Sequence, residues 1–187
     1  MTKKDTLTHK GETAGPEHFL DADRLFALLP LRPYQKIADI GCGTGYFSLP
    51  LAKYLYDGTL YAVDTKKEML EATREKLMSY RFSNVEFVQS KGTSVPISPA
   101  SLDGALMSCV LYQASDRAAL LQSVSSLMQR GGWLAIIEWY KRETPGGPDV
   151  MERVSEDEIK ALARDSKLRF VGLRSLSDEH YMMTFAA

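Results

Sequence analysis

Short apolar runs alternate with segments of helical periodicity along most of the chain. The apolar runs are bounded by Gly, Pro, Asp or Ser, which is typical of buried β-strands. The predicted strands lie at residues 37–40, 60–63, 85–88, 102–110 and 133–139, and the predicted helices at 21–29, 46–56, 65–80, 115–129 and 155–168. Strands and helices that alternate in this way indicate a doubly wound α/β fold, with a mostly parallel sheet and helices on both faces.

The last two apolar runs break this alternation, because no helix is predicted between them. Residues 170–173 and 181–185 are therefore predicted to pair as an antiparallel hairpin. They complete a seven-stranded, Rossmann-like sheet with an antiparallel last strand. Local signals set several helix boundaries: Asp21 as an N-cap, capping boxes that begin at Thr65 and Ser155, and a stop at Arg130-Gly131-Gly132.

The composition is that of a single globular domain. The 187 residues are 44% hydrophobic and 25% charged. Residues 1–15 are polar and are predicted to form a disordered arm, with ordering over a bound ligand as the alternative, so that residues 16–187 form the domain. A net charge of −1 makes a nucleic-acid partner unlikely. Two cysteines and the lack of an apolar run long enough for an export signal or a membrane span predict a cytoplasmic location.

The most informative stretch is Asp39-Ile40-Gly41-Cys42-Gly43-Thr44-Gly45, where a predicted strand leads into a helix. Glycines at such a turn let the backbone approach a ligand closely, and the helix start offers free N–H groups. Asp64 ends the next predicted strand about 20 residues further on, where a carboxylate can accept hydrogen bonds from ribose hydroxyls. The pair predicts a nucleoside site. The alternatives are a tight turn without a ligand and, for Asp64, a helix cap.

Other nucleotide-binding motifs fit the sequence less well. A dinucleotide fingerprint requires a third glycine where this chain has Tyr46, whose ring would crowd a diphosphate over the helix start. A P-loop sequence is also missing, which disfavours nucleoside triphosphate hydrolysis.

At these residues the chain resembles the class I S-adenosylmethionine-dependent methyltransferases, and among them the small ubiquinone/menaquinone-biosynthesis type. Asp39 and the three glycines match the family's first motif, and Asp64 matches its ribose-binding acid. Residues 96–110, 130–137 and 181–185 are similar to later segments of the family's sheet. The resemblance implies S-adenosylmethionine as the cofactor, S-adenosylhomocysteine as the product, and a small-molecule methyl acceptor.

The resemblance also implies which residues contact the cofactor. Backbone from Gly41 to Gly43 would lie against the methionine part, while Asp64 would bind the ribose. Met69 would flank the adenine, although a core position is the alternative. The full set of implied contacts is Asp39, Gly41, Cys42, Gly43, Gly45, Asp64, Thr65, Met69, Ser90, Ser108 and Cys109.

One position departs from the family pattern. Many relatives carry an Asp after the third strand that accepts a hydrogen bond from the adenine amino group, whereas this chain has Ser90-Lys91-Gly92. A lysine side chain has only donors and cannot accept that bond. Ser90, backbone or water would then hold the adenine, with Lys91 directed to solvent.

Methyl transfer from a sulfonium is mainly a problem of alignment, so a general base is needed only for an acceptor that must lose a proton. The candidate catalytic residues are Tyr112, Glu138 and His180, which lie at or near predicted strand ends. The alternative for Glu138 is a carboxylate that holds backbone or Arg142, and the alternative for His180 is a surface histidine. Tyr46, Tyr112, Trp139 and Tyr140 are candidates for an aromatic acceptor pocket or for ordinary packing.

Two arginines, Arg142 and Arg153, bracket a Pro-Gly loop and are interpreted as solvated charges, with pairing to an acidic acceptor as the alternative. The sequence has no metal-ligand spacing, so no metal is predicted. Two other functions stay open: an NAD(P)-binding oxidoreductase and a cofactor-binding protein without catalysis.

Overall fold

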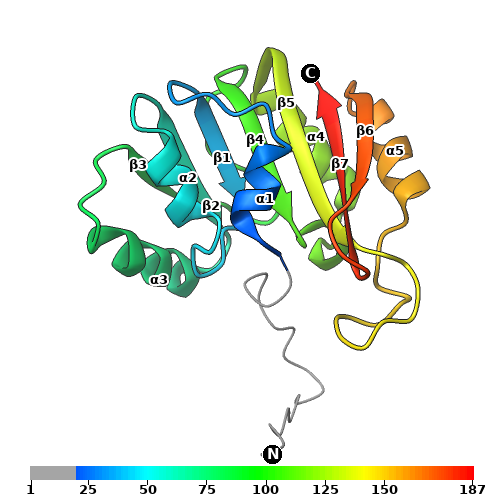
Figure 1. Cartoon of the computed structure of the whole chain (residues 1–187). Helices are drawn as coiled ribbons and strands as arrows, with labels where there is room; N and C mark the ends of the chain where they lie inside the picture. Colours follow the sequence, from blue (N-terminus) through cyan, green and yellow to red (C-terminus); the bar gives the residue numbers. More distant parts are fainter. Residues whose placement is uncertain (1–19) are drawn as a thin grey trace, which may run out of the picture.

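A computed structural model describes residues 20–187, which form one seven-stranded sheet flanked by helices (Figure 1). The predicted arm at residues 1–15 lies outside the described residues. The strands are β1 (Lys36–Ile40), β2 (Thr59–Asp64), β3 (Val85–Gln89), β4 (Leu102–Ser108), β5 (Met128–Trp139), β6 (Arg169–Ser175) and β7 (His180–Ala186). The helices are α1 (Ala22–Ala27), α2 (Ser48–Tyr54), α3 (Lys67–Met78), α4 (Arg117–Leu127) and α5 (Glu156–Asp165), with a 3-10 turn η2 (Leu111–Gln113).

The strand order is β3-β2-β1-β4-β5-β7-β6. The pairs from β3 to β5 are parallel, and β7 is antiparallel to both of its neighbours. The prediction of a mostly parallel doubly wound sheet with an antiparallel last strand is therefore confirmed. The chain reverses direction across the sheet between β1 and β4, which leaves the carboxyl ends of these strands open at one edge.

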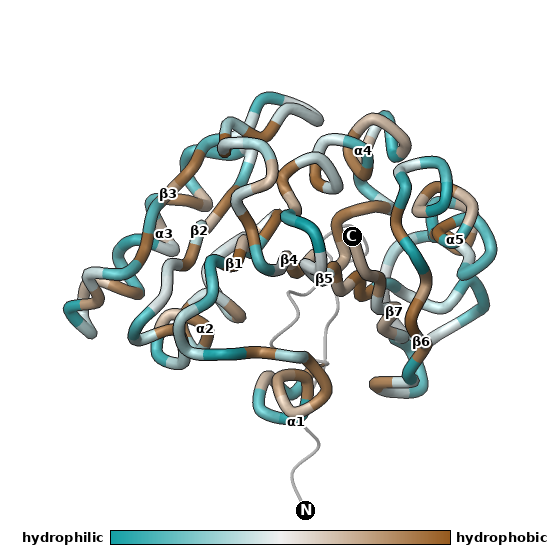
Figure 2. Tube along the Cα trace, turned by 90° about the horizontal axis from the view of Figure 1, so that it is seen from above, coloured by the Kyte–Doolittle hydropathy of each residue, from teal (hydrophilic) through white to brown (hydrophobic). Residues whose placement is uncertain are grey.

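Helices cover both faces of the sheet (Figure 2). On one face, Leu25 of α1 and Leu51 of α2 pack in one apolar cluster with Ile37 of β1. On the other face, Leu121 of α4 and Ile159 of α5 belong to a second cluster. The central strands are buried on both faces, so their buried residues are consecutive, as at residues 134–137 of β5, whereas the helices bury residues at helical spacing. These are the apolar runs and helical periodicities that made the elements predictable.

Helix caps agree with the sequence at two of three predicted positions. The Asp21 carboxylate accepts the N–H groups of Asp23 and Arg24, and the Ser155 hydroxyl accepts that of Glu158. Thr65 was predicted to cap α3, which is wrong. The N-cap of α3 is Lys66, whose own N–H is bound by the Asp64 carboxylate.

Two boundaries differ from the prediction on either side of α4. The predicted strand 102–110 ends at Ser108, and the chain turns into η2 after Cys109, whose φ is +57°. Helix α4 ends at Leu127 and not at residue 129, because Met128 adopts an extended conformation and pairs with Leu102 of β4. At Met128, tertiary pairing overrides the local helix signal.

Candidate functional site

The glycine loop connects β1 to α2 at the carboxyl edge of the sheet. Gly41 has a φ of +73°, and a Cβ atom there would lie 2.5 Å from Cγ2 of Val110. Gly45 has a φ of +78°, and a Cβ atom there would lie 2.9 Å from Cγ2 of Thr73. Both positions therefore require glycine, because the loop packs closely against the segment after β4 and against α3.

Asp64 fixes this loop from the end of β2. Its Oδ2 atom accepts the N–H of Gly43 at 3.0 Å, and its Oδ1 atom accepts the N–H of Lys66 at 2.9 Å. Thr73 of α3 donates its hydroxyl to the Gly43 carbonyl at 2.7 Å. The carboxylate thus braces the glycine loop and starts α3 at the same time. A carboxylate has about four acceptor sites, so it retains capacity for further donors.

A cavity of about 420 Å³ opens beside this loop. Its volume falls in the range of about 300–1,000 Å³ that is typical of small-molecule sites. Eight of the residues implied as cofactor contacts line it: Gly41, Gly43, Asp64, Thr65, Met69, Ser90, Ser108 and Cys109. Sequence reasoning missed other lining residues, which carry no local motif: Ile40, Lys66, Gly92, Thr93, Val95, Val110, Gln113, Ala114, Ser115 and Leu120.

Three implied contacts, Asp39, Cys42 and Gly45, support the loop and do not line the cavity. Asp39 is buried and accepts the Ser48 hydroxyl at 2.6 Å, so that it ties the loop to the start of α2. Burial raises the pKa of Asp39 to about 6, the Ser48 hydrogen bond opposes the shift, and the Asp64 charge adds to it. Cys42 packs against Leu70, and burial raises its thiol pKa above the ordinary range.

The residues at the end of β4 form the opposite wall of the cavity. The N–H of Cys109 donates to the backbone carbonyl of Ile137 in β5 at 2.8 Å. Burial, together with the Glu138 charge, raises the pKa of the Cys109 thiol. The Ser108 hydroxyl is buried here and lacks a hydrogen-bond partner within the described part of the chain. A buried hydroxyl at a cavity wall can form a hydrogen bond with a ligand group or with water.

The departure at Ser90-Lys91-Gly92 also has a structural explanation. Ser90 is buried, and its N–H donates to the backbone carbonyl of Asp64 at 2.9 Å. Lys91 exchanges two backbone hydrogen bonds with Ser94, both at 3.0 Å, and is exposed. Ser90 and Gly92 line the cavity whereas Lys91 does not, so the lysine side chain does not replace the family's adenine acceptor.

The three candidate catalytic residues do not line this cavity. Glu138 is fully buried behind η2, and burial raises its pKa to about 8 against the backbone hydrogen bonds from Tyr112 and Leu111 that lower it. His180 is also buried: its ring centroid lies 4.0 Å from that of Trp139, and its Nδ1 atom lies 3.3 Å from the Ser177 hydroxyl. The surface interpretation of His180 is therefore wrong.

The environment of His180 also affects its chemistry. Burial and the nearby Arg153 charge lower its pKa to about 4, which makes the imidazole a weak base at neutral pH. Tyr112, half-buried in η2, packs against the cluster that contains α4 and α5. The structure thus gives none of the three a direct place at the cavity.

Arg153 is not a solvated charge. It is 2% exposed and donates to the backbone carbonyls of Tyr140, Arg142, Gly146 and Pro148. Its guanidinium carbon lies 5.2 Å from the centroid of the buried Trp139 ring. Arg153 therefore holds the loop after β5 in place, and the interpretation as a surface charge is wrong. Arg142, in contrast, is exposed and lies over the Tyr140 ring.

A second cavity of about 550 Å³ lies between the start of α1 and the turn from β6 to β7. Leu20, Leu25 and Leu176 contribute apolar surface, Arg24 contributes a positive charge, and Asp21 and Asp178 contribute carboxylates. The Leu20 carbonyl accepts the hydroxyl of Tyr46, which follows the glycine loop. This hydrogen bond joins Leu20, which lines the second cavity, to the residue that follows the glycine loop.

The arrangement is that of a doubly wound α/β domain with a ligand-sized cavity between a glycine loop after β1 and an acid at the end of β2. A family model for a methyltransferase domain matches residues 32–185, and the chain belongs to this family. Within residues 20–187, His, Cys, Asp and Glu side chains do not form a group of three that could hold a metal ion. The same residues contain no helix with the length and apolar character needed to cross a membrane.

Individual relatives agree with this assignment. A ubiquinone/menaquinone biosynthesis C-methyltransferase from Campylobacter jejuni is 31% identical over 125 residues, which cover 63% of this chain and 50% of the relative. The O-methyltransferase rstn1 from Aspergillus nomiae is 24% identical over 155 residues, or 77% of this chain and 68% of that protein. The chain thus spans about half the length of the Campylobacter relative.

A solved structure shares the fold over nearly the whole chain. It is a SAM-dependent methyltransferase from Aquifex aeolicus that is 23% identical and covers 91% of both chains, with a TM-score of 0.85.

Proposed function

We propose that the protein is an S-adenosylmethionine-dependent methyltransferase that acts on a small molecule. The observation that carries this proposal is the position of Asp64, whose carboxylate contacts the backbone of the glycine loop at the wall of a ligand-sized cavity. Its remaining acceptor sites suit the two hydroxyls of a ribose. The residues present therefore fit the nucleoside part of the cofactor.

The other walls fit the rest of that molecule. The buried Ser108 hydroxyl and the backbone of Gly41 and Gly43 offer polar groups for the methionine part. Met69 and Leu120 offer apolar surface for the adenine. When bound, S-adenosylmethionine would supply a methyl group on a sulfonium, which is an excellent leaving group.

The chain's own residues then have to hold and align the reactants and exclude water. Because the candidate acids and bases are buried away from the cavity, this proposal assigns no general base. The second cavity beside Leu20 and Tyr46 is our candidate for the acceptor, with an apolar body against Leu25 and Leu176. A cytoplasmic location is part of the proposal, since the free thiols of Cys42 and Cys109 suit a reducing compartment.

Tyr46 supports this function over NAD(P) binding. Its ring packs on Phe47 with centroids 4.8 Å apart, and its hydroxyl donates to the Leu20 carbonyl. The side chain is therefore held at the position where a dinucleotide-binding turn has its third glycine.

Calorimetric titration with S-adenosylhomocysteine tests the proposal. We expect wild-type protein to bind in the micromolar range and Asp64→Asn to bind at least tenfold more weakly, since one acceptor oxygen becomes a donor. Asp57→Asn, the same change at an exposed position, is the control and should bind like wild type. Failure of wild type to bind at millimolar concentration would overturn the proposal, and binding of NADH instead would favour an oxidoreductase. Labelled methyl transfer from S-adenosylmethionine into a metabolite library separates an enzyme from a binding protein without catalysis.

A further inference from the structure

The turn η2 separates the cofactor cavity from the interior of the domain. Leu111 and Tyr112 are the first two residues of η2, and their neighbours Val110 and Gln113 both line the cavity. Ala114 and Ser115 continue this wall. Any displacement of η2 would therefore move this wall. A turn of three residues has little hydrogen bonding of its own to hold it in place.

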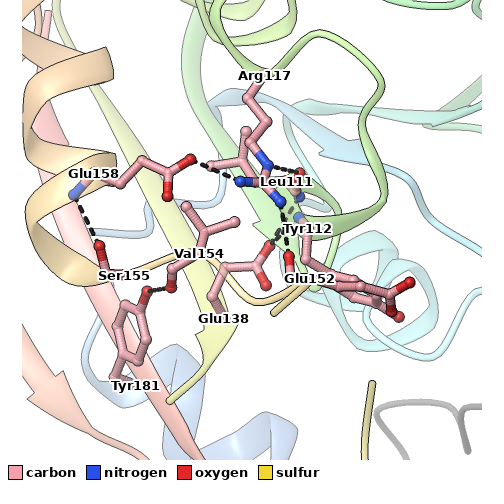
Figure 3. A network of polar contacts seen from close by, with 9 residues as sticks. All are labelled: Leu111, Tyr112, Arg117, Glu138, Glu152, Val154, Ser155, Glu158 and Tyr181. Carbon is pink, nitrogen blue, oxygen red and sulfur yellow. Dashed lines mark hydrogen bonds and ion pairs between the residues drawn. The ribbon is translucent and has the colours of Figure 1, made fainter. Parts of the chain in front are cut away.

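Glu138 binds the backbone of η2 from behind. Its Oε1 atom accepts the N–H of Leu111 at 2.8 Å and that of Tyr112 at 3.3 Å (Figure 3). The first N–H groups of a helical turn have no partner within the turn, so the buried carboxyl group satisfies donors that would otherwise be orphaned. Its Oε2 atom is also buried and makes no hydrogen bond within residues 20–187.

Arg117 holds the same turn through the backbone carbonyl of Leu111. Its Nε atom donates to the Leu111 carbonyl at 3.2 Å. The other guanidinium nitrogens donate to the Glu158 carboxylate of α5 and to the Glu152 carbonyl, each at 2.7 Å (Figure 3). The planar guanidinium thus anchors η2 to α5 and to the end of the loop that Arg153 holds together.

A carboxyl group in the core is not the choice that packing alone would favour. Burial of Glu138 costs free energy that an apolar side chain of similar volume would avoid. The contact that only a polar group can make is the one to the two N–H groups of η2. The geometry therefore links Glu138 to the placement of this turn.

We propose that Glu138 and Arg117 are positioning residues for the cofactor, which act through η2 and do not touch the cofactor themselves. This inference rests on the proposed function, because it takes the cavity beside Asp64 as the cofactor site. It replaces the interpretation of Glu138 as a catalytic residue.

The test compares S-adenosylhomocysteine affinity and urea unfolding across five forms of the full chain, wild type and four variants. Glu138→Leu removes the acceptor and should weaken binding at least tenfold. Glu138→Gln keeps an oxygen acceptor and should restore affinity to within about threefold of wild type. Arg117→Met removes the hydrogen bond to the Leu111 carbonyl and should weaken binding at least fivefold.

Tyr181→Phe is the matched control for lost stability. It removes the buried hydrogen bond from the Tyr181 hydroxyl to the Val154 carbonyl, at 2.8 Å, and leaves η2 untouched. It should lower the urea midpoint while affinity stays within twofold of wild type. A merely structural role for Glu138 would give a Glu138→Leu variant that behaves like Tyr181→Phe, with a lower urea midpoint and an affinity within twofold of wild type.

The outcomes separate the two proposals. If wild type binds and Glu138→Leu binds equally well, the positioning role is overturned and the proposed function stands. If wild type does not bind at millimolar S-adenosylhomocysteine, the proposed function fails and takes this inference with it. Should Glu138→Leu fail to fold, Arg117→Met and the Gln variant still decide: equal affinity of Arg117→Met and wild type would contradict the positioning role.

Discussion

The burial of Glu138 should make the stability of this protein fall as the pH rises through neutrality. The carboxyl has a pKa of about 8 in the folded state, against an ordinary value of 4.5. Between these values the folded state keeps the proton and the unfolded state does not. The unfolded state therefore binds fewer protons, and stability decreases with rising pH across this window.

The size of the effect follows from the shift. Each pH unit inside the window costs about 1.4 kcal/mol. Two other buried groups titrate lower, since the pKa of His180 lies at about 4 and that of Asp39 at about 6. His180 has an ordinary pKa of 6.5 and still titrates in the unfolded state at the lower end of the interval from about pH 6.5 to 8, but its contribution is the same in a variant changed only at position 138. The difference between wild type and such a variant across this interval therefore isolates Glu138, and it predicts a loss of about 2 kcal/mol.

The assay is urea unfolding followed by tryptophan fluorescence, since Trp133 and Trp139 are both buried in the fold. Glu138→Gln keeps the shape and the acceptor but cannot ionise, so it serves as the comparison at every pH. The variant should gain about 2 kcal/mol relative to wild type between pH 6.5 and 8. A constant difference between the two proteins across this interval would refute the reasoning, because it would mean that Glu138 does not titrate there.

Three further predictions concern the loops around the two cavities. Gly45→Ala places a methyl group against Thr73 at a φ of +78° and should cost about 2 kcal/mol in urea unfolding; an unchanged midpoint would show that the loop relaxes freely. Arg153→Met leaves several carbonyls without a donor and should cost about 3 kcal/mol and speed proteolysis of the loop after β5, whereas equal digestion rates would contradict its role as a clamp. Leu176→Trp fills the second cavity and should abolish methyl transfer in the library assay while S-adenosylhomocysteine affinity stays within twofold; full transfer activity would exclude this cavity as the acceptor site.

The features that could be predicted from the sequence are those with local causes. The periodicity of apolar residues predicts the strands and helices, and the glycines with Asp64 predict the cavity, because these signals lie within single segments of the chain. Eight of the implied cofactor contacts line that cavity. Thr65 fails as a cap for a similarly local reason: the neighbouring Asp64 carboxylate takes the N–H of Lys66.

The roles of buried polar residues could not be predicted in this way. Glu138 was a candidate catalytic residue because it ends a strand, but its hydrogen-bond partners are 26 and 27 residues away in the chain. Arg153 was interpreted as a surface charge, and only the folded loop brings four carbonyls around its guanidinium. A charged residue in a sequence carries no mark of the partners that allow its burial.

The connection between β3 and β4 and the residues behind η2 contribute to the cavity wall in different ways. Residues 90–101 contain turns and the single bridge between Lys91 and Ser94, and no helix. Val95 is the buried apolar side chain that this segment contributes to the cavity lining. Leu111 of η2 is buried in the same apolar cluster as Val95, while hydrogen bonds from β5 and α4 hold the backbone of the turn. The residues that hold η2, Glu138 and Arg117, do not line the cavity, so neither a motif nor the cavity lining would have located them.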